Sequence, residues 1–132
     1  MGIVAFNGPH LKEATVDQRR HTIVTLNEHR DASGHHVSLR GRLDFHTVPD
    51  VRIVLHRIVD DGSDDLLLDL AECEIGDATG FGVIVECLRR ARRGSRTFSI
   101  VDADQRTRRL LRRARLNHVV GSVPQTITTA VS

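Results

Sequence analysis

A short apolar run followed by a helical pattern does most to limit how this chain can fold. Residues 66–70 read Leu-Leu-Leu-Asp-Leu, which is too short for a helix and typical of a strand buried on both faces. After a short acidic loop, the apolar residues resume with helical spacing at Phe81, Ile84, Val85 and Leu88. The loop therefore joins the end of a buried strand to the start of a helix, where open α/β sheets tend to build their sites.

The first half of the chain predicts a β-hairpin and then a helix. Residues 21–28 and 37–39 alternate between apolar and polar types on either side of a turn at Ser33-Gly34, as hairpin strands do. Pro49, with an acidic neighbour, suits the first turn of a helix, and Asp60-Asp61-Gly62 suits its end. The residues that this helix should bury are Val51, Val54, Leu55 and Ile58.

The second half continues to alternate strand and helix. The helix after the acidic loop should run to Arg93, with Gly94 as the residue that follows its end. A strand is expected over residues 97–101, and Asp102 or Asp104 should begin another helix. Weaker patterns near the C-terminus indicate a short edge strand at Val119-Val120 and a helix or tail from Pro124.

These elements divide the chain into an arm and one domain. Residues 1–20 contain Gly8-Pro9 and mixed charges without a clear period, and we interpret them as a flexible N-terminal arm. Residues 21–132 should form a single α/β domain, with a mixed β-sheet and helices packed mainly on one face. Only 3% of the residues are aromatic, so the core of this domain must be aliphatic.

Two segments resemble the signature motifs of the STAS domain family. Asp77-Ala78-Thr79-Gly80-Phe81-Gly82-Val83-Ile84, preceded by Leu68-Asp69-Leu70 and Ile75, resembles the signature loop of that family. Upstream, Leu39-Arg40-Gly41-Arg42-Leu43-Asp44-Phe45-His46-Thr47 resembles its other recognisable segment, a strand that ends in Gly-x-Leu-Asp before the first helix. The resemblance covers roughly residues 22–131 and implies a STAS-like fold. For a stand-alone bacterial member it implies an anti-sigma factor antagonist.

The resemblance also implies a partner and a surface that binds it. The partner would be an anti-sigma factor or serine kinase of the histidine-kinase-like type, and the protein would act in stress-related transcriptional regulation. Whether the chain also forms a homodimer is left open. The residues expected to form the partner surface are Asp44, His46, Gly76, Asp77, Ala78, Thr79, Gly80, Phe81 and Gly82.

One residue of the loop departs from the family pattern. In the family, the serine directly after the aspartate is phosphorylated by the partner kinase, whereas this chain has Ala78 there. Three outcomes stay open: an antagonist that is always in its binding form, phosphorylation of Thr79 instead, or a different partner. Asp77 and Thr79 are both credible N-caps of the following helix, and we expect capping to occupy the Thr79 hydroxyl.

An uneven distribution of charge raises an alternative function. Residues 86–115 contain eleven arginines and three acidic residues, while residues 1–85 contain eight basic and fourteen acidic ones. An arginine-rich nucleic-acid-binding domain is therefore the alternative interpretation. The one aromatic residue within residues 86–115, Phe98, sits in a predicted strand and is not available for stacking, and no helix-turn-helix signal occurs. We expect a solvated face or a surface for an acidic protein partner.

Other classes of function leave no motif in the sequence. Asp44, Asp69 and Asp77 suggest a carboxylate cluster with His46 as a base, but no nucleophile stands at recognisable spacing from a base. The chain has no Gly-rich phosphate loop, so we expect neither enzyme activity nor a cofactor.

The cysteines and histidines also lack the spacing of a metal motif. Cys73 and Cys87 should be two small buried thiols, and His35-His36 should belong to the hairpin turn, so no metal site is expected. No apolar run approaches the roughly 18 residues of a membrane span, and the N-terminus lacks a signal peptide. We therefore expect a cytoplasmic protein.

Overall fold

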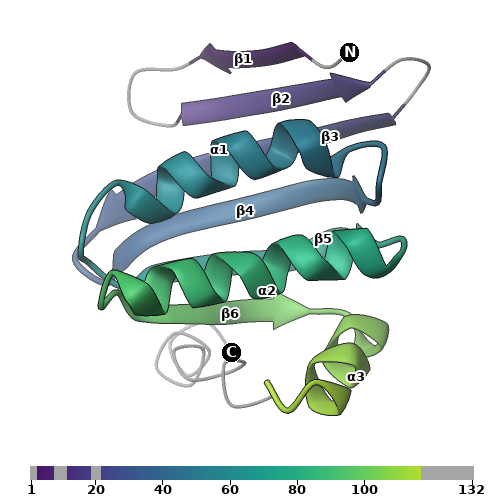
Figure 1. Ribbon diagram of the computed structural model, residues 1–132. Coiled ribbons are helices and arrows are strands. Elements are labelled where there is room, and N and C mark those ends of the chain that lie inside the picture. The colour runs from purple at the N-terminus through teal and green to yellow at the C-terminus, as the bar shows by residue number, and fades with distance from the viewer. Residues whose placement is uncertain (1–2, 8–11, 19–21, 117–132) are drawn as a thin grey trace, which may run out of the picture.

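The structure is a computed structural model that describes residues 3–7, 12–18 and 22–116. Within these residues, six strands form one sheet in the order β1-β2-β3-β4-β5-β6, accompanied by three helices (Figure 1). The strands are β1 (Ile3–Asn7), β2 (Lys12–Gln18), β3 (Thr22–Asp31), β4 (Gly34–Leu43), β5 (Leu66–Ile75) and β6 (Phe98–Ala103). The helices are α1 (Val48–Asp60), α2 (Ala78–Arg93) and α3 (Gln105–Arg113).

The sheet is mixed, as predicted, because its two halves are connected differently. Strands β1 to β4 pair antiparallel, whereas β4, β5 and β6 run parallel. Parallel neighbours need a long crossover, and α1 and α2 supply it. These two helices lie side by side on one face of the sheet, and α3 lies beyond β6 (Figure 1). The predicted hairpin and the α/β architecture are confirmed.

The core lies between the sheet and the two long helices and is aliphatic, as expected. Strand β5 contributes Leu66, Leu68 and Leu70, each at most 2% exposed. Phe98 is the one aromatic side chain among the buried hydrophobic residues of the described chain. Helix α1 buries the four residues that the sequence predicted. Helix α2 differs: Gly80, Val83, Ile84, Cys87, Leu88 and Ala91 are buried, while Phe81 and Val85 are only half-buried.

The N-terminal segment differs from the loose arm that we predicted. Strand β1 pairs with β2, and β2 pairs with β3, so that Ala14 lies opposite Leu26 and Val16 opposite Val24. Ala14 and Val16 alternate with polar residues, which is the pattern of a half-covered strand. Two alternating apolar residues are a weak signal of a strand, and the sequence therefore does not distinguish this segment from an arm. Where the domain begins stays a prediction.

Strand β5 is longer than predicted and shortens the acidic loop to Gly76-Asp77. Acidic residues that we interpreted as loop continue the strand alongside β4, and arginines on β4 pair with them. Arg40 Nε lies 2.6 Å from Glu72 Oε1, and Arg42 Nη1 lies 2.9 Å from Glu74 Oε2. Such cross-strand pairs of opposite charge support a strand register.

Helix α2 ends slightly differently from the prediction. Gly94 is the C-cap residue of α2, with φ −89°. The residue after it, Ser95, takes the left-handed conformation with φ 59°. The Arg96 N–H then donates to the Ala91 carbonyl at 2.8 Å. Asp104 begins α3 by accepting from Thr107 N, as one of our two alternatives predicted. The elements predicted at Val119-Val120 and from Pro124 lie outside the described residues.

Candidate functional site

The two motif segments meet at one edge of the sheet. Strands β4 and β5 run parallel and end together, with Leu43 opposite Ile75. The Gly76 N–H donates to the Leu43 carbonyl at 2.7 Å, which fixes the loop after β5 against the turn after β4. Both connections, to α1 and to α2, therefore lie side by side at the right of Figure 1. We call residues 44–47 and 76–82 together the corner.

Asp77 joins the two halves of the corner. Its Oδ1 accepts from Gly80 N at 2.9 Å and caps α2, and its Oδ2 accepts from Phe45 N at 3.0 Å. These backbone hydrogen bonds, the Gly80 bond foremost, hold the Asp77 pKa below its usual range. Of the two candidate caps, Asp77 is the one that caps the helix. The expectation that capping occupies Thr79 is wrong, and the Thr79 side chain is exposed.

Asp44 shapes the corner from inside. The residue is 8% exposed, and its Oδ1 accepts from the backbone N–H groups of His46 at 2.9 Å and Thr47 at 3.2 Å. Its Oδ2 accepts from Arg42 Nε at 3.1 Å. A carboxylate that folds back on the N–H two residues later makes an Asx turn. Asp44 therefore sets the path of the chain into α1 and offers little surface to a partner.

Gly80 serves a close approach of two backbones. It is buried, and a Cβ built on it would overlap the Leu43 carbonyl oxygen and lie 2.7 Å from the carbonyl carbon. Gly82, two residues later on α2, is exposed, and a Cβ there would meet no atom within 4 Å. The two glycines of the motif therefore have different roles. Gly80 allows α2 to pack closely against the end of β4, and Gly82 lies on the surface.

The exposed part of the corner is small and carries little charge. His46, Ala78, Thr79 and Gly82 are exposed, while Gly76, Asp77 and Phe81 are intermediate. The sequence analysis missed Phe45, which is 62% exposed and whose ring centroid lies 3.9 Å from that of His46. An aromatic residue in a loop of a chain with only four phenylalanines is a signal that could have identified it.

Arg42 forms ion pairs with two carboxylates beside the corner. Arg42 lies between Asp44 and Glu74, and these two carboxylates raise its pKa. Glu74 Oε2 lies 2.9 Å from Arg42 Nη1, but Asp77 is held by backbone N–H groups alone, so one arginine faces three carboxylates. The corner therefore presents small residues and one exposed aromatic ring in slightly acidic surroundings.

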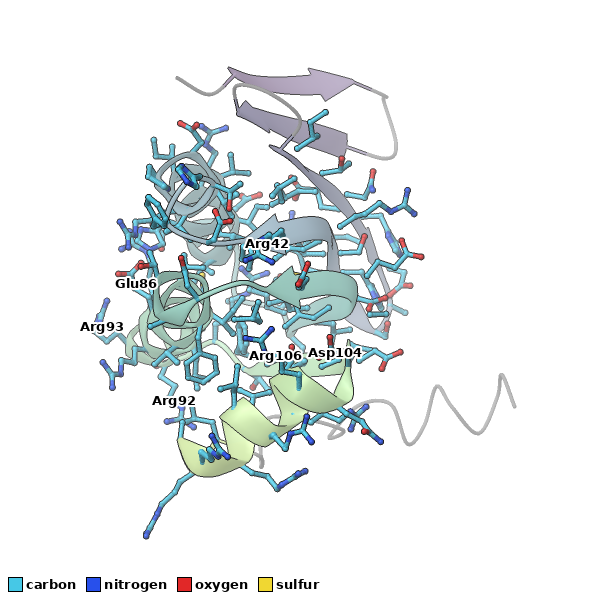
Figure 2. The ribbon with its side chains drawn as sticks, turned by 90° about the vertical axis from the view of Figure 1, so that its right-hand side faces the viewer. Arg42, Glu86, Arg92, Arg93, Asp104 and Arg106 are labelled. Carbon is cyan, nitrogen blue, oxygen red and sulfur yellow. The ribbon has the colours of Figure 1, made fainter. Side chains whose placement is uncertain are left out.

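The arginines of residues 86–115 do not form one uniform surface. Arg90 makes a two-pronged pair with Asp60, at 2.8 and 2.7 Å, and Arg96 is buried. Arg92 and Arg93 extend from α2 away from the sheet, whereas Arg106 lies near Asp104 at the start of α3 (Figure 2). The arginines thus divide among structural and surface roles.

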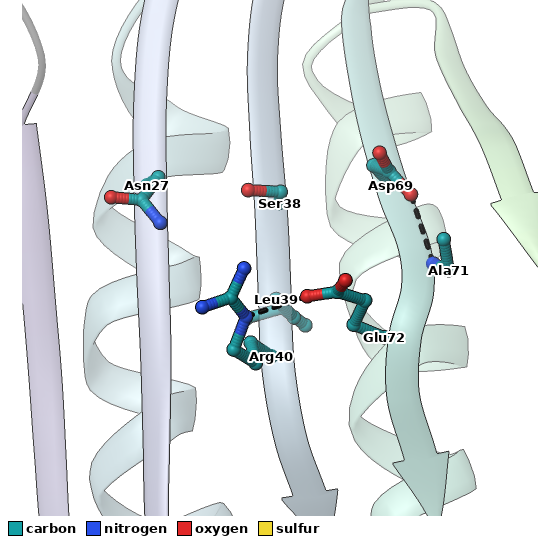
Figure 3. Close-up of a pocket in the computed structure, with 7 residues that line it drawn as sticks. All are labelled: Asn27, Ser38, Leu39, Arg40, Asp69, Ala71 and Glu72. Atoms are coloured by element: carbon teal, nitrogen blue, oxygen red, sulfur yellow. Dashed lines mark hydrogen bonds and ion pairs between the residues drawn. The ribbon is translucent and has the colours of Figure 1, made fainter.

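A polar hollow of about 260 Å³ lies on the sheet face opposite the helices (Figure 3). Arg40 and Glu72 pair across it at 2.6 Å, and the Asp69 carboxylate accepts from Ala71 N at 2.9 Å. The hollow is lined by Asn27, Ser38, Leu39, Arg40, Asp69, Ala71 and Glu72. Arg40 and Glu72 thus pair with each other, and the Asp69 carboxylate is held by a backbone N–H.

Of the other groups considered from the sequence, the two cysteines are free and buried, as predicted. Burial raises the pKa of both the Cys73 and the Cys87 thiol to about 12, so neither is reactive at neutral pH. Across the part of the chain that the structure describes, no helix is both long and apolar enough to span a membrane.

Comparison with known proteins finds a matching family model and similar curated proteins. The family model described as "Mlab, STAS domain" matches residues 26–122. Anti-sigma-B factor antagonists from Staphylococcus epidermidis and Staphylococcus aureus are 31% identical over 74 residues, which is 56% of this chain and 68% of each relative.

Solved structures share the fold. An anti-sigma factor antagonist from Mycobacterium paratuberculosis matches with a TM-score of 0.65 and 22% identity, over 82% of this chain and 93% of that one. The phosphorylated form of the Bacillus cell fate determinant SpoIIAA matches with a TM-score of 0.61 and 14% identity, over 80% and 98%.

Proposed function

This chain belongs to the STAS domain family, and from that membership we propose that it is an anti-sigma factor antagonist that works by binding a protein partner. Relatives with 31% identity carry this name. The observation that carries the proposal is the Asp77 carboxylate, which ties the two motif segments into one exposed corner. We infer that the protein acts in the cytoplasm, in bacterial transcriptional regulation, and that it binds without catalysing a reaction.

The corner suits a partner that covers it closely. Ala78 and Thr79 offer small side chains and Gly82 has none, so a partner backbone could approach the start of α2. Phe45, exposed on the other half of the corner, would supply an aromatic anchor of the kind that dominates binding energy at interfaces. We propose that the partner is a kinase-type anti-sigma factor and that it contacts Phe45, His46 and the first turn of α2.

The switch that the family places in this loop requires a hydroxyl at position 78. A phosphoryl group there would add about −1.5 to −2 charges near the N-terminus of α2, where the helix dipole favours an anion. Ala78 is the first helical residue, is exposed and has no atom that can accept a phosphoryl group. We propose that position 78 is not switched. Since Asp77 caps the helix, the exposed Thr79 hydroxyl is the remaining acceptor in the loop.

The proposal is tested by capturing the partner with the full chain from extract of the source cells and identifying it by mass spectrometry. We expect an anti-sigma factor with a kinase fold on the wild-type chain and none on Ala78→Arg, which places a large cation on the corner. Arg89→Ala, an exposed change farther along α2, serves as the control. Retention of the same protein by Ala78→Arg and wild type would contradict the proposed surface.

The captured kinase then tests the switch by intact mass. We expect no phosphate on wild type and one on Ala78→Ser, because the serine restores an acceptor at an exposed helix N-terminus. Wild type that gains one phosphate, and loses it in Thr79→Val, would show that Thr79 is the switch and that the chain is not constitutively active.

A further inference from the structure

Two histidines and an aspartate meet at the tip of the β3–β4 hairpin. His29 lies directly opposite His36 in the antiparallel register, and their rings stack with centroids 4.7 Å apart and planes 2° apart. Asp31, two residues after His29, projects to the same face of the sheet as His29. This tip is at the opposite end of β4 from the corner, so it is independent of the proposed partner surface.

The three side chains already approach the geometry of a shared metal ion. Asp31 Oδ1 lies 3.0 Å from His36 Nε2, Asp31 Oδ2 lies 3.9 Å from His29 Nε2, and the candidate ligand atoms all lie within 4.8 Å of one another. Tetrahedral Zn²⁺ with bonds of about 2.0–2.2 Å places neighbouring ligand atoms roughly 3.4 Å apart. The observed separations of the carboxylate from the two rings bracket this value. The two stacked rings, whose candidate ligand atoms lie within 4.8 Å of each other, must also turn toward a common point to bind one ion.

Ser33 orients the set from the turn. Its N–H and its hydroxyl both donate to Asp31 Oδ1, at 2.8 and 2.6 Å, and its hydroxyl oxygen lies 2.8 Å from His36 Nε2. Asp31 Oδ2 receives no bond from Ser33 and faces His29. Hydrogen bonds that hold one carboxylate oxygen while the other stays open are typical of supported metal ligands. The Ser33 contact with His36 Nε2, the nitrogen that would bind the metal, is given up on binding.

Positive charge is directed away from the tip. Arg30, which lies between His29 and Asp31, projects to the other face, where its guanidinium lies 3.1 Å from Asp64 Oδ2 and also pairs with Asp61. At the tip itself, the side chains of His29 and Asp31 are about half exposed and that of His36 is 22% exposed, so an ion can enter from solvent.

We propose that His29, Asp31 and His36 bind a divalent transition metal ion, Zn²⁺ foremost, with water completing the coordination. Two imidazoles and one carboxylate are a donor set that suits Zn²⁺. The sequence analysis expected no metal site because it searched for histidines that are close in sequence. His29 and His36 are seven positions apart and come together only through the hairpin register.

The test titrates Zn²⁺ into the EDTA-treated full chain and follows binding by calorimetry and by NMR of the histidine rings. We expect one Zn²⁺ per chain, with the His29 and His36 resonances perturbed. His29→Ala and His36→Ala should each weaken binding at least tenfold. Asp31→Asn, which keeps an acceptor for Ser33, should do the same. Ser33→Ala should cost about tenfold, as the loss of a supporting hydrogen bond does.

The matched control is His46→Ala, since His46 is an exposed histidine at the far end of β4. It should bind Zn²⁺ as wild type does. Circular dichroism without zinc shows whether each variant is folded, and Asp31→Asn retains the turn if an alanine variant unfolds. Undiminished Zn²⁺ binding in the His29→Ala/His36→Ala double variant, or no saturable binding at millimolar zinc, would overturn the proposal.

Discussion

A pair of glycine-to-alanine variants measures how tightly α2 is seated on β4. Gly80 and Gly82 lie in the same helix, two residues apart, and differ mainly in their surroundings. A Cβ on Gly80 would lie 2.7 Å from the Leu43 carbonyl carbon and 3.0 Å from the Leu43 Cβ, whereas a Cβ on Gly82 would enter open space. Gly82→Ala is therefore a matched control for Gly80→Ala.

The expected magnitudes follow from two opposing effects. Replacing a helical glycine by alanine stabilises a helix by about 0.5–1 kcal/mol, and this gain is available at both positions. At Gly80 it is offset by overpacking, which typically costs about 1–3 kcal/mol. A backbone carbonyl cannot rotate aside as a side chain can, so the cost should lie at the upper end. Because the helix gain cancels in the comparison, the two variants should differ by about 3 kcal/mol.

Urea unfolding of the wild type and the two variants supplies the free energies of unfolding. We expect Gly82→Ala to be more stable than wild type and Gly80→Ala to be clearly less stable, with similar slopes against urea concentration. If Gly80→Ala matched Gly82→Ala in stability, the close approach of Gly80 to Leu43 would be refuted, and with it the reason for a glycine at this position of the motif.

Two further predictions concern pH and nucleic acid. Burial lowers the pKa of His35, so the folded state takes up fewer protons than the unfolded chain; the free energy of unfolding should therefore fall as pH drops below about 6.5. His35→Gln should flatten this slope above pH 5, and an unchanged slope would show that another group causes it. For mixed-sequence duplex DNA we expect no micromolar binding at physiological salt, because Arg90 and Arg108 are paired and Arg96 is buried. Micromolar affinity with a steep salt dependence would contradict this.

The pH prediction rests on a tautomer that the hydrogen bonds determine. Arg96 Nη2 lies 2.9 Å from His35 Nδ1, and a guanidinium can only donate, so Nδ1 accepts and carries no proton. His35 Nε2 then donates to Glu28 Oε1 at 2.7 Å. Protonating Nδ1 would remove the acceptor of a buried arginine, which also donates to the carbonyls of Ile58 and Val59 at 2.8 Å.

Most of the fold could be predicted from sequence because its signals are local. The hairpin turn, the proline at the start of α1 and the apolar run in β5 each specify an element through a few neighbouring residues. The length of β5 could not be predicted in this way. Its acidic second half pairs with β4, where Arg40 and Arg42 lie opposite Glu72 and Glu74, and that pairing depends on register between distant segments.

In the candidate site, too, local motifs could be recognised from the sequence, whereas the burial of individual residues could not. Motif resemblance located the corner, but it did not separate the residues that build it from those that it exposes. Asp44 turns back onto the N–H groups of His46 and Thr47, and Gly80 is buried against Leu43, a contact between distant segments that no local pattern reveals. Phe45 was missed for the converse reason: the sequence does not show that a loop phenylalanine stays outside the core.

The central claim is that a partner docks on the corner, and the affinity of the captured partner for Phe45→Ala tests it most directly. Phe45 and Ile53 are similarly exposed, at 62% and 61%, but Ile53 lies on α1 and is not one of the corner residues, so Ile53→Ala is the control. Loss of an aromatic anchor typically costs about 2 kcal/mol or more, which is over tenfold in affinity. We predict at least a tenfold rise in Kd for Phe45→Ala and none for Ile53→Ala. Equal affinity of Phe45→Ala and wild type would contradict the claim.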